Sequence, residues 1–335
     1  MDKSMATTSD TTLRSYTVIM PAYNEESSIK AALDSISEAD KHTSYTLDAI
    51  IVCINGCTDA TESIVRNWDT LPVVIIYSKP GYLSAMNKLL AYTRKHHGSS
   101  PMLKLDADSV VEPHCIQRLL SELDAHPELK LAGGHPLPSK LSNHPLHQRL
   151  LGRILSLRSI YPLAERAVHD VEEYHPFALA DPQAGIGNIE TKLKIYFHGR
   201  VWCARQPSMI PLLHSTVLGD DVFLNDWLYT KYGPTALRVI YGANVYFKPN
   251  YSLVRHWKVY KRIYEDKERV RILPSYEILH QMRKTHLGWS YIVTRVPFYD
   301  AILFSIYGVI RFIEEKSFAH TVYKLSYWQY EEKES

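Results

Sequence analysis

The chain is poor in the features that mark secreted, zinc-binding and membrane-spanning proteins. Its 335 residues include four cysteines, Cys53, Cys57, Cys115 and Cys203, which lack the paired spacing of a zinc site. No secretory signal precedes them, so we expect reduced thiols in the cytoplasm, with the inner face of a membrane as the alternative location. The formal net charge is only +2, which provides no strong field to attract nucleic acid.

Long apolar runs are also absent. Residues 296–313 are apolar and aromatic, but the uncharged stretch 301–310 lies between Asp300 and Arg311 and has ten residues. A membrane-spanning helix needs about twenty. We therefore expect at most peripheral membrane contact. A buried core helix is the favoured interpretation of this segment, and an amphipathic helix lying on a membrane surface is the alternative.

What the sequence does contain is an alternation of strand and helix patterns. Apolar residues at helical spacing follow each of several short apolar runs, and this alternation is typical of an α/β protein. Hydrophobic residues make up 45% of the chain, enough for a sizeable core. We predict a mostly parallel, Rossmann-like sheet with helices on both faces. The expected strands are residues 16–20, 47–54, 73–77, 102–105 and 129–134.

Two aspartates follow the expected strand 102–105. Asp106 and Asp108 are one residue apart, and in an extended strand such side chains point the same way because the side-chain period is two. A carboxylate pair of this kind can hold Mg²⁺ or Mn²⁺ together with the phosphates of a substrate. The alternative is an ordinary surface turn, because aspartate favours turns.

Three other strands end in polar loops, at residues 21–26, 55–61 and 79–87. In parallel sheets, ligands bind outside the carboxyl ends of the strands, so we expect these loops and the aspartate pair to meet at one rim. Helix capping is the alternative for Asp59, because Asp59 and Glu62 fit a capping box.

The loops also carry a resemblance. Their sequences are similar to those of family 2 glycosyltransferases, which have the GT-A fold. The similar segments, in the order and spacing of that family, are 17–26 (TVIMPAYNEE), 55–61 (NGCTDAT), 81–87 (GYLSAMN), 105–109 (LDADS), 198–205 (HGRVWCAR) and 219–224 (GDDVFL).

The resemblance implies an inverting, metal-dependent transfer of a sugar from a nucleoside-diphosphate sugar to an acceptor hydroxyl. It assigns the metal to Asp108 and Asp106, and general-base catalysis to Asp221 with Asp220 beside it. The alternative for the last two is favourable charge at a helix N-terminus. The implied donor-binding residues are Pro21, Ala22, Tyr23, Glu25, Asn55, Asp59, Gly81, Asn87 and Asp106.

The chain departs from the family pattern in two places. Tyr82 stands after Gly81, where the family usually has a basic residue, and Lys79 is the substitute that we consider. The later Gln-x-x-Arg-Trp element is absent as such and is matched only by residues 255–262, which argues against processive polysaccharide synthesis. Further candidates are Arg205, Trp257 and Arg262 as site residues and His256 as a third metal ligand, with simple packing as the alternative for the histidine.

We divide the chain into a flexible tail (1–13), a nucleotide-sugar-binding half (14–135), an acceptor-binding and catalytic half (136–250) and a C-terminal helical segment (251–335). The expected acceptor is a glycan, a lipid-linked or a small-molecule hydroxyl. Two alternatives stay open. One is a catalytically silent family member that binds nucleotide sugar. The other is a sugar-phosphate nucleotidyltransferase, which needs a glycine-rich, arginine-bearing loop where residues 21–26 have neither residue.

Overall fold

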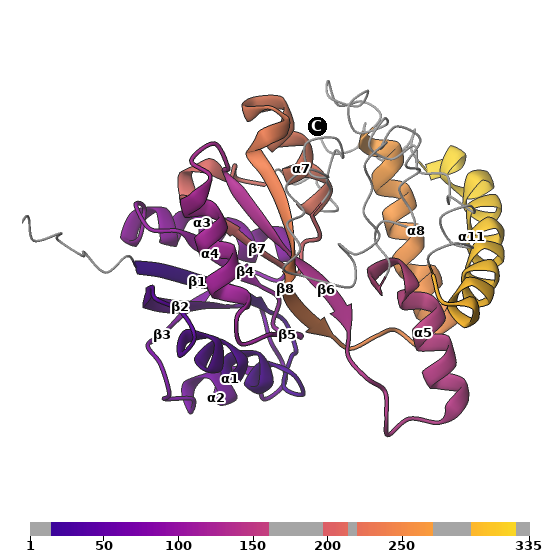
Figure 1. Cartoon of the computed structure of the whole chain (residues 1–335), viewed down its shortest axis with the longest axis horizontal. Helices are drawn as coiled ribbons and strands as arrows, with labels where there is room; N and C mark the ends of the chain where they lie inside the picture. Colours follow the sequence, from indigo (N-terminus) through magenta and orange to yellow (C-terminus); the bar gives the residue numbers. More distant parts are fainter. Residues whose placement is uncertain (1–14, 161–196, 214–219, 271–295, 326–335) are drawn as a thin grey trace, which may run out of the picture.

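The computed structural model of the chain describes residues 15–160, 197–213, 220–270 and 296–325 (Figure 1). The expected flexible tail lies outside these residues. The strands are β1 (Ser15–Ala22), β2 (Thr46–Ile54), β3 (Val73–Tyr77), β4 (Met102–Leu105), β5 (Ser109–Val111), β6 (Leu131–Pro138), β7 (Val201–Ala204) and β8 (Leu237–Phe247). The helices are α1 (Ile29–Asp40), α2 (Thr61–Arg66), α3 (Tyr82–His96), α4 (Cys115–Ala125), α5 (Leu146–Ile160), η3 (Pro207–Met209), α7 (Asp220–Tyr232), η4 (Pro234–Ala236), α8 (Leu253–Val270) and α11 (Phe298–Leu325).

The described strands form one sheet in the order β3-β2-β1-β4-β7-β6-β8-β5. The pairs β2–β3, β1–β2, β1–β4 and β6–β8 are parallel. β7 is antiparallel to both β4 and β6, and β5 is antiparallel to β8. The expected mostly parallel sheet is therefore confirmed, with three antiparallel pairs that the sequence did not predict. Since β7 is antiparallel to both β4 and β6, these two strands run in the same direction. β8 is parallel to β6, so β6 and β8 run in the same direction as β1 and β4.

The order of the strands creates a crevice beside β1. The chain moves outward from β1 to β3 and then returns to β4 on the other side of β1. Neighbouring loops therefore leave the sheet in opposite directions at the carboxyl ends of β1 and β4. Such a switch point is where open α/β sheets bind their ligands.

Helices cover both faces of the sheet, as expected. One face carries α1, α2 and α4, and apolar residues of β1 and β2 such as Val18 and Ile50 pack beneath them. The other face carries α3 and α7, where Met86 and Leu224 pack with Ile19 and Ile51. Alternate residues of β1 and β2 face opposite layers, so the central runs Val18–Met20 and Ala49–Ile54 are continuously apolar and buried, the pattern of a parallel sheet covered on both sides.

The helices α5, α8 and α11 form a group beside the sheet, at the right of Figure 1. Leu303, Phe304 and Tyr307 bury one side of α11 against α5 and α8. The opposite side of the same helix is exposed, so the interpretation of this segment as a buried core helix is wrong for that side. Within the described residues, no helix has both the length and the apolar character needed to cross a membrane.

Glycine at position 134 in β6 is required by its neighbours. A Cβ atom there would collide with Cγ1 of Val201 and lie 2.9 Å from the carbonyl oxygen of Ala243. We expect Gly134→Ala to lower the free energy of unfolding by about 1–3 kcal/mol, the usual cost of an overpacked core. Urea unfolding followed by circular dichroism would measure this change.

Gly308→Ala in α11 is the matched control, because no atom lies within 4 Å of a Cβ at that position. Alanine is favoured over glycine inside a helix by about 1 kcal/mol, so this variant should be as stable as the parent or more stable. Equal losses in both variants would contradict the steric explanation.

Candidate functional site

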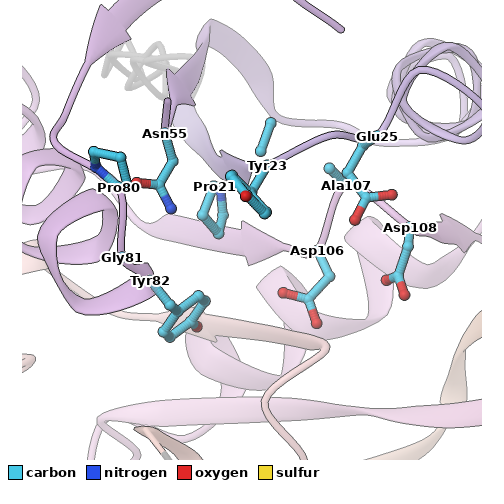
Figure 2. Close-up of a pocket in the computed structure, with 11 residues that line it drawn as sticks. Pro21, Tyr23, Glu25, Asn55, Pro80, Gly81, Tyr82, Asp106, Ala107 and Asp108 are labelled. Carbon is cyan, nitrogen blue, oxygen red and sulfur yellow. The ribbon is translucent and has the colours of Figure 1, made fainter. Parts of the chain in front are cut away.

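A pocket of about 610 Å³ opens at the switch point. It is formed by the loops that follow β1, β2, β3 and β4, so the carboxyl ends of these strands do meet at one rim (Figure 2). The size is typical of small-molecule sites. The lining residues are Pro21, Ala22, Tyr23, Glu25, Asn55, Pro80, Gly81, Tyr82, Asp106, Ala107 and Asp108.

Side chains tie the loops after β1 and β2 to each other. The Oδ1 atom of Asn24 accepts a hydrogen bond of 2.8 Å from the backbone N–H of Thr58. Asn24 has a φ of 54°, a left-handed conformation that asparagine adopts more easily than most residues. The Asp59 carboxylate accepts hydrogen bonds from the backbone N–H groups of Glu26 and Thr61. This pairing fixes the rim on which Tyr23 and Glu25 stand.

Asp59 itself does not line the pocket. Its carboxylate accepts a hydrogen bond from the N–H of Thr61, the first residue of α2, but the N-cap residue of that helix is Ala60, so Asp59 supports the helix start from one position before the cap. Glu26 takes part in the same arrangement, because its Oε2 atom accepts a hydrogen bond of 3.0 Å from the N–H of Ala60. A direct role for Asp59 in binding a ligand stays a prediction.

The aspartate pair lies in a turn and not in an extended strand. β4 ends at Leu105, and the N–H of Ser109 donates to the carbonyl oxygen of Asp106 at 3.1 Å, which closes a four-residue turn. The period-two argument for the direction of the two side chains is therefore wrong. The turn nevertheless brings both carboxylates to the pocket, where Figure 2 shows them pointing to the same side.

Asp106 is held by a buried lysine. Lys104 in β4 is 1% exposed, and its ammonium donates hydrogen bonds to Oδ1 of Asp106 and to the carbonyl oxygen of Gly199. Burial raises the pKa of the Asp106 carboxyl, and the charges of Lys104 and Arg200 oppose that rise. The ammonium thus fixes the orientation of Asp106 and joins it to the segment before β7.

Asp108 is held by an arginine. The Nη1 atom of Arg200 lies 3.1 Å from Oδ1 and 3.3 Å from Oδ2 of Asp108. The guanidinium carbon lies 4.2 Å from the centre of the Phe247 ring, a cation–π contact that limits where the arginine can point. Each of the two carboxylates is therefore paired with a cationic side chain of the protein itself.

The first turn of α7, in the second half of the chain, contacts the pocket through Tyr82. The Tyr82 hydroxyl donates a hydrogen bond of 2.5 Å to Oδ2 of Asp220. Burial, and next the charge of Asp220, raises the pKa of Tyr82, so its hydroxyl keeps the proton that it donates. Burial also raises the pKa of Asp220, and Asp221 adds to this rise while Lys104 opposes it. Gly199 lies against this turn, since a Cβ there would be 3.4 Å from Oδ1 of Asp220 and 3.5 Å from Cβ of Asp221.

The donor set of the pocket suits a hard divalent cation. Asp106 and Asp108 provide carboxylate oxygens, the ligands that Mg²⁺ and Mn²⁺ prefer. No group of three or more His, Cys, Asp or Glu side chains forms a metal site in the part of the chain that the structure describes. A cation at the pair would therefore take its remaining ligands from phosphate and water, which is common for Mg²⁺.

Several predicted residues have structural contacts outside the pocket lining. The amide of Asn87 pairs with both backbone groups of Leu213. Arg205 donates to three backbone carbonyl groups around the end of α4, those of Leu123, His126 and Leu129. Lys79 is exposed, one residue before the lining segment. Their proposed contacts with a ligand stay predictions.

The C-terminal candidates lie in α8 and are not part of the pocket lining either. The Nδ1 atom of His256 lies 2.7 Å from Oε1 of Glu314 in α11, and the histidine is buried. The Trp257 ring contacts Phe318, with 4.7 Å between ring centres. Arg262 belongs to α8, but its side chain is outside the described part. Metal binding by His256 stays a prediction.

The motifs do not assign roles to Lys104 or Arg200, and they mark Tyr82 only as a departure from a pattern. A lysine in a short strand usually indicates an exposed position, so its burial could not be foreseen. For Tyr82 a signal existed, since an aromatic hydroxyl can serve as a donor where a basic residue is missing. Its partner Asp220 is 138 positions away in the sequence, and that contact depends on the fold.

A comparison with known protein families covers the part of the chain that forms the pocket. The model of the family described as Glycosyl transferase family 2 matches residues 17–166, from β1 to just beyond α5. The match contains all four loops of the pocket. The segment before β7, which provides Arg200, and α7, which provides Asp220, lie outside it.

The architecture is shared with a solved structure. Mannosyltransferase PcManGT from Pyrobaculum calidifontis, in complex with GDP-Man and Mn²⁺, is 17% identical, with 93% of this chain and 84% of that chain covered and a TM-score of 0.54. Glucosyl-3-phosphoglycerate synthase from Mycobacterium tuberculosis, in complex with Mn²⁺, UDP-glucose and phosphoglyceric acid, is 18% identical, with 76% and 78% covered and a TM-score of 0.48. No curated protein sequence matches the chain. The expected GT-A fold is confirmed.

The Arg200–Asp108 ion pair should weaken the binding of a divalent cation. A divalent cation at Asp108 must compete with the guanidinium for the same oxygens. Hydrogen bonds between charged groups are worth about 1.5–3 kcal/mol, so we expect Arg200→Gln to bind Mn²⁺ without nucleotide about tenfold more tightly or better. Isothermal titration of Mn²⁺ into the protein measures this.

Arg255→Gln is the control, because it removes the same charge from an exposed position in α8. Its affinity for Mn²⁺ should equal that of the parent protein. An equal gain in both variants would mean that only the overall charge matters, and an unchanged Arg200→Gln would show that the cation does not use Asp108.

Proposed function

We propose that the protein is a family 2 glycosyltransferase that moves a sugar from a nucleoside-diphosphate sugar to an acceptor hydroxyl with inversion. The observation that carries this proposal is the pocket at the switch point, where Asp106 and Asp108 meet the loops of three other strands. The family match over residues 17–166 supports it. The similar mannosyltransferase, whose complex contains GDP-Man and Mn²⁺, supports a nucleotide-sugar donor.

The donor would lie along the rim formed by the β1 and β2 loops. Tyr23 and Asn55 would contact the base and ribose, and the segment around Gly81 would bring backbone close to the diphosphate. Asp106, oriented by Lys104, would contact the ribose or the cation, and Asp108 would bind the cation. A Mn²⁺ or Mg²⁺ ion bound there would neutralise the diphosphate as it leaves.

Arg200 would change partners when the donor binds. Its guanidinium neutralises Asp108 in the structure, and a diphosphate offers it stronger and bidentate acceptors. Release of Asp108 would then make both of its oxygens available for the cation. This exchange would favour joint binding of cation and nucleotide over binding of the cation alone.

Asp221 is our proposed general base. It stands beside Asp220 in the first turn of α7, and Asp220 is already bound by the Tyr82 hydroxyl. A general base must lie within hydrogen-bond reach of the attacking hydroxyl, on the side of the sugar opposite the diphosphate. The acceptor is an alcohol of a glycan, of a lipid-linked molecule or of a small molecule.

The geometry of the pocket supports the two alternative functions less well. A nucleotidyltransferase would need a glycine- and arginine-bearing loop after β1, where Tyr23 and Glu25 line the pocket. A silent family member would need no ordered carboxylates, yet Asp106, Asp108 and Asp220 are each fixed by a specific partner. Incubation with labelled UDP-, GDP-, TDP- and CDP-sugars and Mn²⁺ tests this, because an active transferase hydrolyses its donor slowly.

Asp108→Ala tests the role of the cation. We expect it to abolish transfer and Mn²⁺-dependent binding of nucleotide, because Asp108 is the carboxylate that we assign directly to the cation. The measurement is a thermal-shift titration of nucleoside diphosphates with and without Mn²⁺. A hundredfold excess over Kd should stabilise the parent protein by about 2.7 kcal/mol.

Asp69→Ala, an exposed carboxylate after α2, is the control and should keep the full shift. A folded Asp108→Ala protein with the activity of the parent would exclude this site. If the parent itself shows no shift with any nucleotide, the proposed donor class is wrong.

Asp221→Asn tests the base. General acid–base groups contribute about 10²–10⁴-fold, so we expect kcat to fall within that range while donor affinity, measured by calorimetry, is unchanged. Asp220→Asn should instead weaken the contact with Tyr82 and lower stability. If donor affinity falls in step with kcat in Asp221→Asn, the residue binds the donor and is not the base.

A further inference from the structure

One face of α11 is apolar and exposed over its first four turns. Its side chains recur at three- and four-residue spacing, so they form a single stripe along the helix. The most exposed is Phe298, at 83%. The stripe, as we call it from here, consists of Phe298, Ile302, Ile306, Val309, Phe312 and Ile313, with Tyr299 at its edge.

The charged residues of the same turns point inward. Asp300, 1% exposed, forms a two-fold ion pair with Arg153 of α5 at 2.6 and 2.7 Å. Glu314 is buried against His256 and also accepts a hydrogen bond from Arg311 at 3.2 Å. A surface helix in water has the reverse arrangement, with apolar residues inside and charges outside. The orientation of α11 therefore fits an apolar environment on its outer side.

The polar group within the stripe is already satisfied by the helix. The hydroxyl of Ser305 donates to the carbonyl oxygen of Ala301 at 3.2 Å. This is how serine side chains are accommodated where no water is present. Protein interfaces usually have about one hydrogen bond per 100–200 Å² and a polar rim, whereas the six residues of the stripe are all hydrocarbon and only Tyr299 at its edge carries a hydroxyl. A lipid surface fits it better than a second protein.

The exposed charges of α8 and α11 favour an anionic lipid surface over a neutral one. Over residues 253–261 and 298–318, where the structure describes the side chains of these helices, the exposed charged residues are Arg255, Lys258, Glu315 and Lys316, and Glu315 is paired with Arg311. Lys316 stands at the end of the stripe, with its ammonium 5.7 Å from the centre of the Phe312 ring. Basic residues beside aromatic and aliphatic ones are typical of helices that bind membrane surfaces.

We propose that α11 is a membrane-docking helix that lies in the plane of an anionic lipid surface, with the stripe inserted between the headgroups. The stripe spans residues 298–313, about 22 Å at 1.5 Å per residue, which is shorter than the hydrocarbon core of about 30 Å. It therefore lies along the surface and does not cross. This inference stands apart from the proposed transfer reaction, because no donor or acceptor enters the argument.

The test is sedimentation of the full chain with phosphatidylcholine vesicles, with and without phosphatidylglycerol. We expect strong binding to the anionic vesicles, and at least a tenfold loss of partitioning in Ile302→Ser/Val309→Ser. Arg255→Gln and Lys258→Gln should each reduce partitioning about fivefold at low salt and have little effect at high salt. The expected result includes a monomer in sedimentation velocity without vesicles.

Leu212→Ser is the matched control, because Leu212 is an exposed leucine at 53% in the segment after η3. It should bind vesicles like the parent, and all variants should keep the parent's thermal unfolding midpoint, since the changed side chains are exposed. A parent protein that does not bind anionic vesicles overturns the proposal. So does a stripe variant that binds as well as Leu212→Ser, or a dimer that the stripe substitutions dissociate.

Discussion

The buried ammonium of Lys104 is the contact on which the site depends. Lys104 lies in β4, an inner strand of the sheet. Its ammonium binds Asp106 and the Gly199 carbonyl, and it lies 5.7 Å from the centre of the Tyr82 ring. Tyr82 in turn binds Asp220, so one cation connects β4, the segment before β7, and the first turns of α3 and α7. Breaking a buried ion pair from one side costs about 3–5 kcal/mol. These four parts of the chain are thus aligned by a single charge.

The pocket's electrostatics follow from this arrangement. Asp106 and Asp108 are balanced by Lys104 and Arg200, so the two carboxylates can stand close together before any ligand is present. A balanced pair is well ordered but not strongly attractive to a lone cation. In the proposed function an anionic diphosphate would change that, because it would attract Arg200 and contribute oxygens of its own. The same four side chains would then have different partners with and without the donor.

The sequence predicted the strands and helices that follow from the spacing of apolar residues. It did not predict features that depend on where a side chain points. The strand at 73–77 was predicted with its bounds, because a short apolar run between turn residues has few other interpretations. Asp106 was placed correctly by motif but for the wrong geometric reason, because a turn cannot be distinguished from the end of a strand by spacing. The burial of Lys104 was missed because its partner Gly199 lies far along the chain. For α11, hydropathy gives the amount of apolar surface and not the side that faces outward.

The topology relates the stripe to the pocket. β6 and β8 run in the same direction as β1 and β4, so all four strands have their carboxyl ends at the edge of the sheet where the pocket opens. α5 follows β6 and α8 follows β8, so both begin from that edge. These two helices hold α11, through Arg153–Asp300 and His256–Glu314. If α11 lies on a lipid surface, the ion pairs that orient its stripe also fix the angle at which the pocket's edge meets that surface. This geometry would suit an acceptor that is presented from the membrane plane, because the protein would then bind its surface and its substrate from the same side.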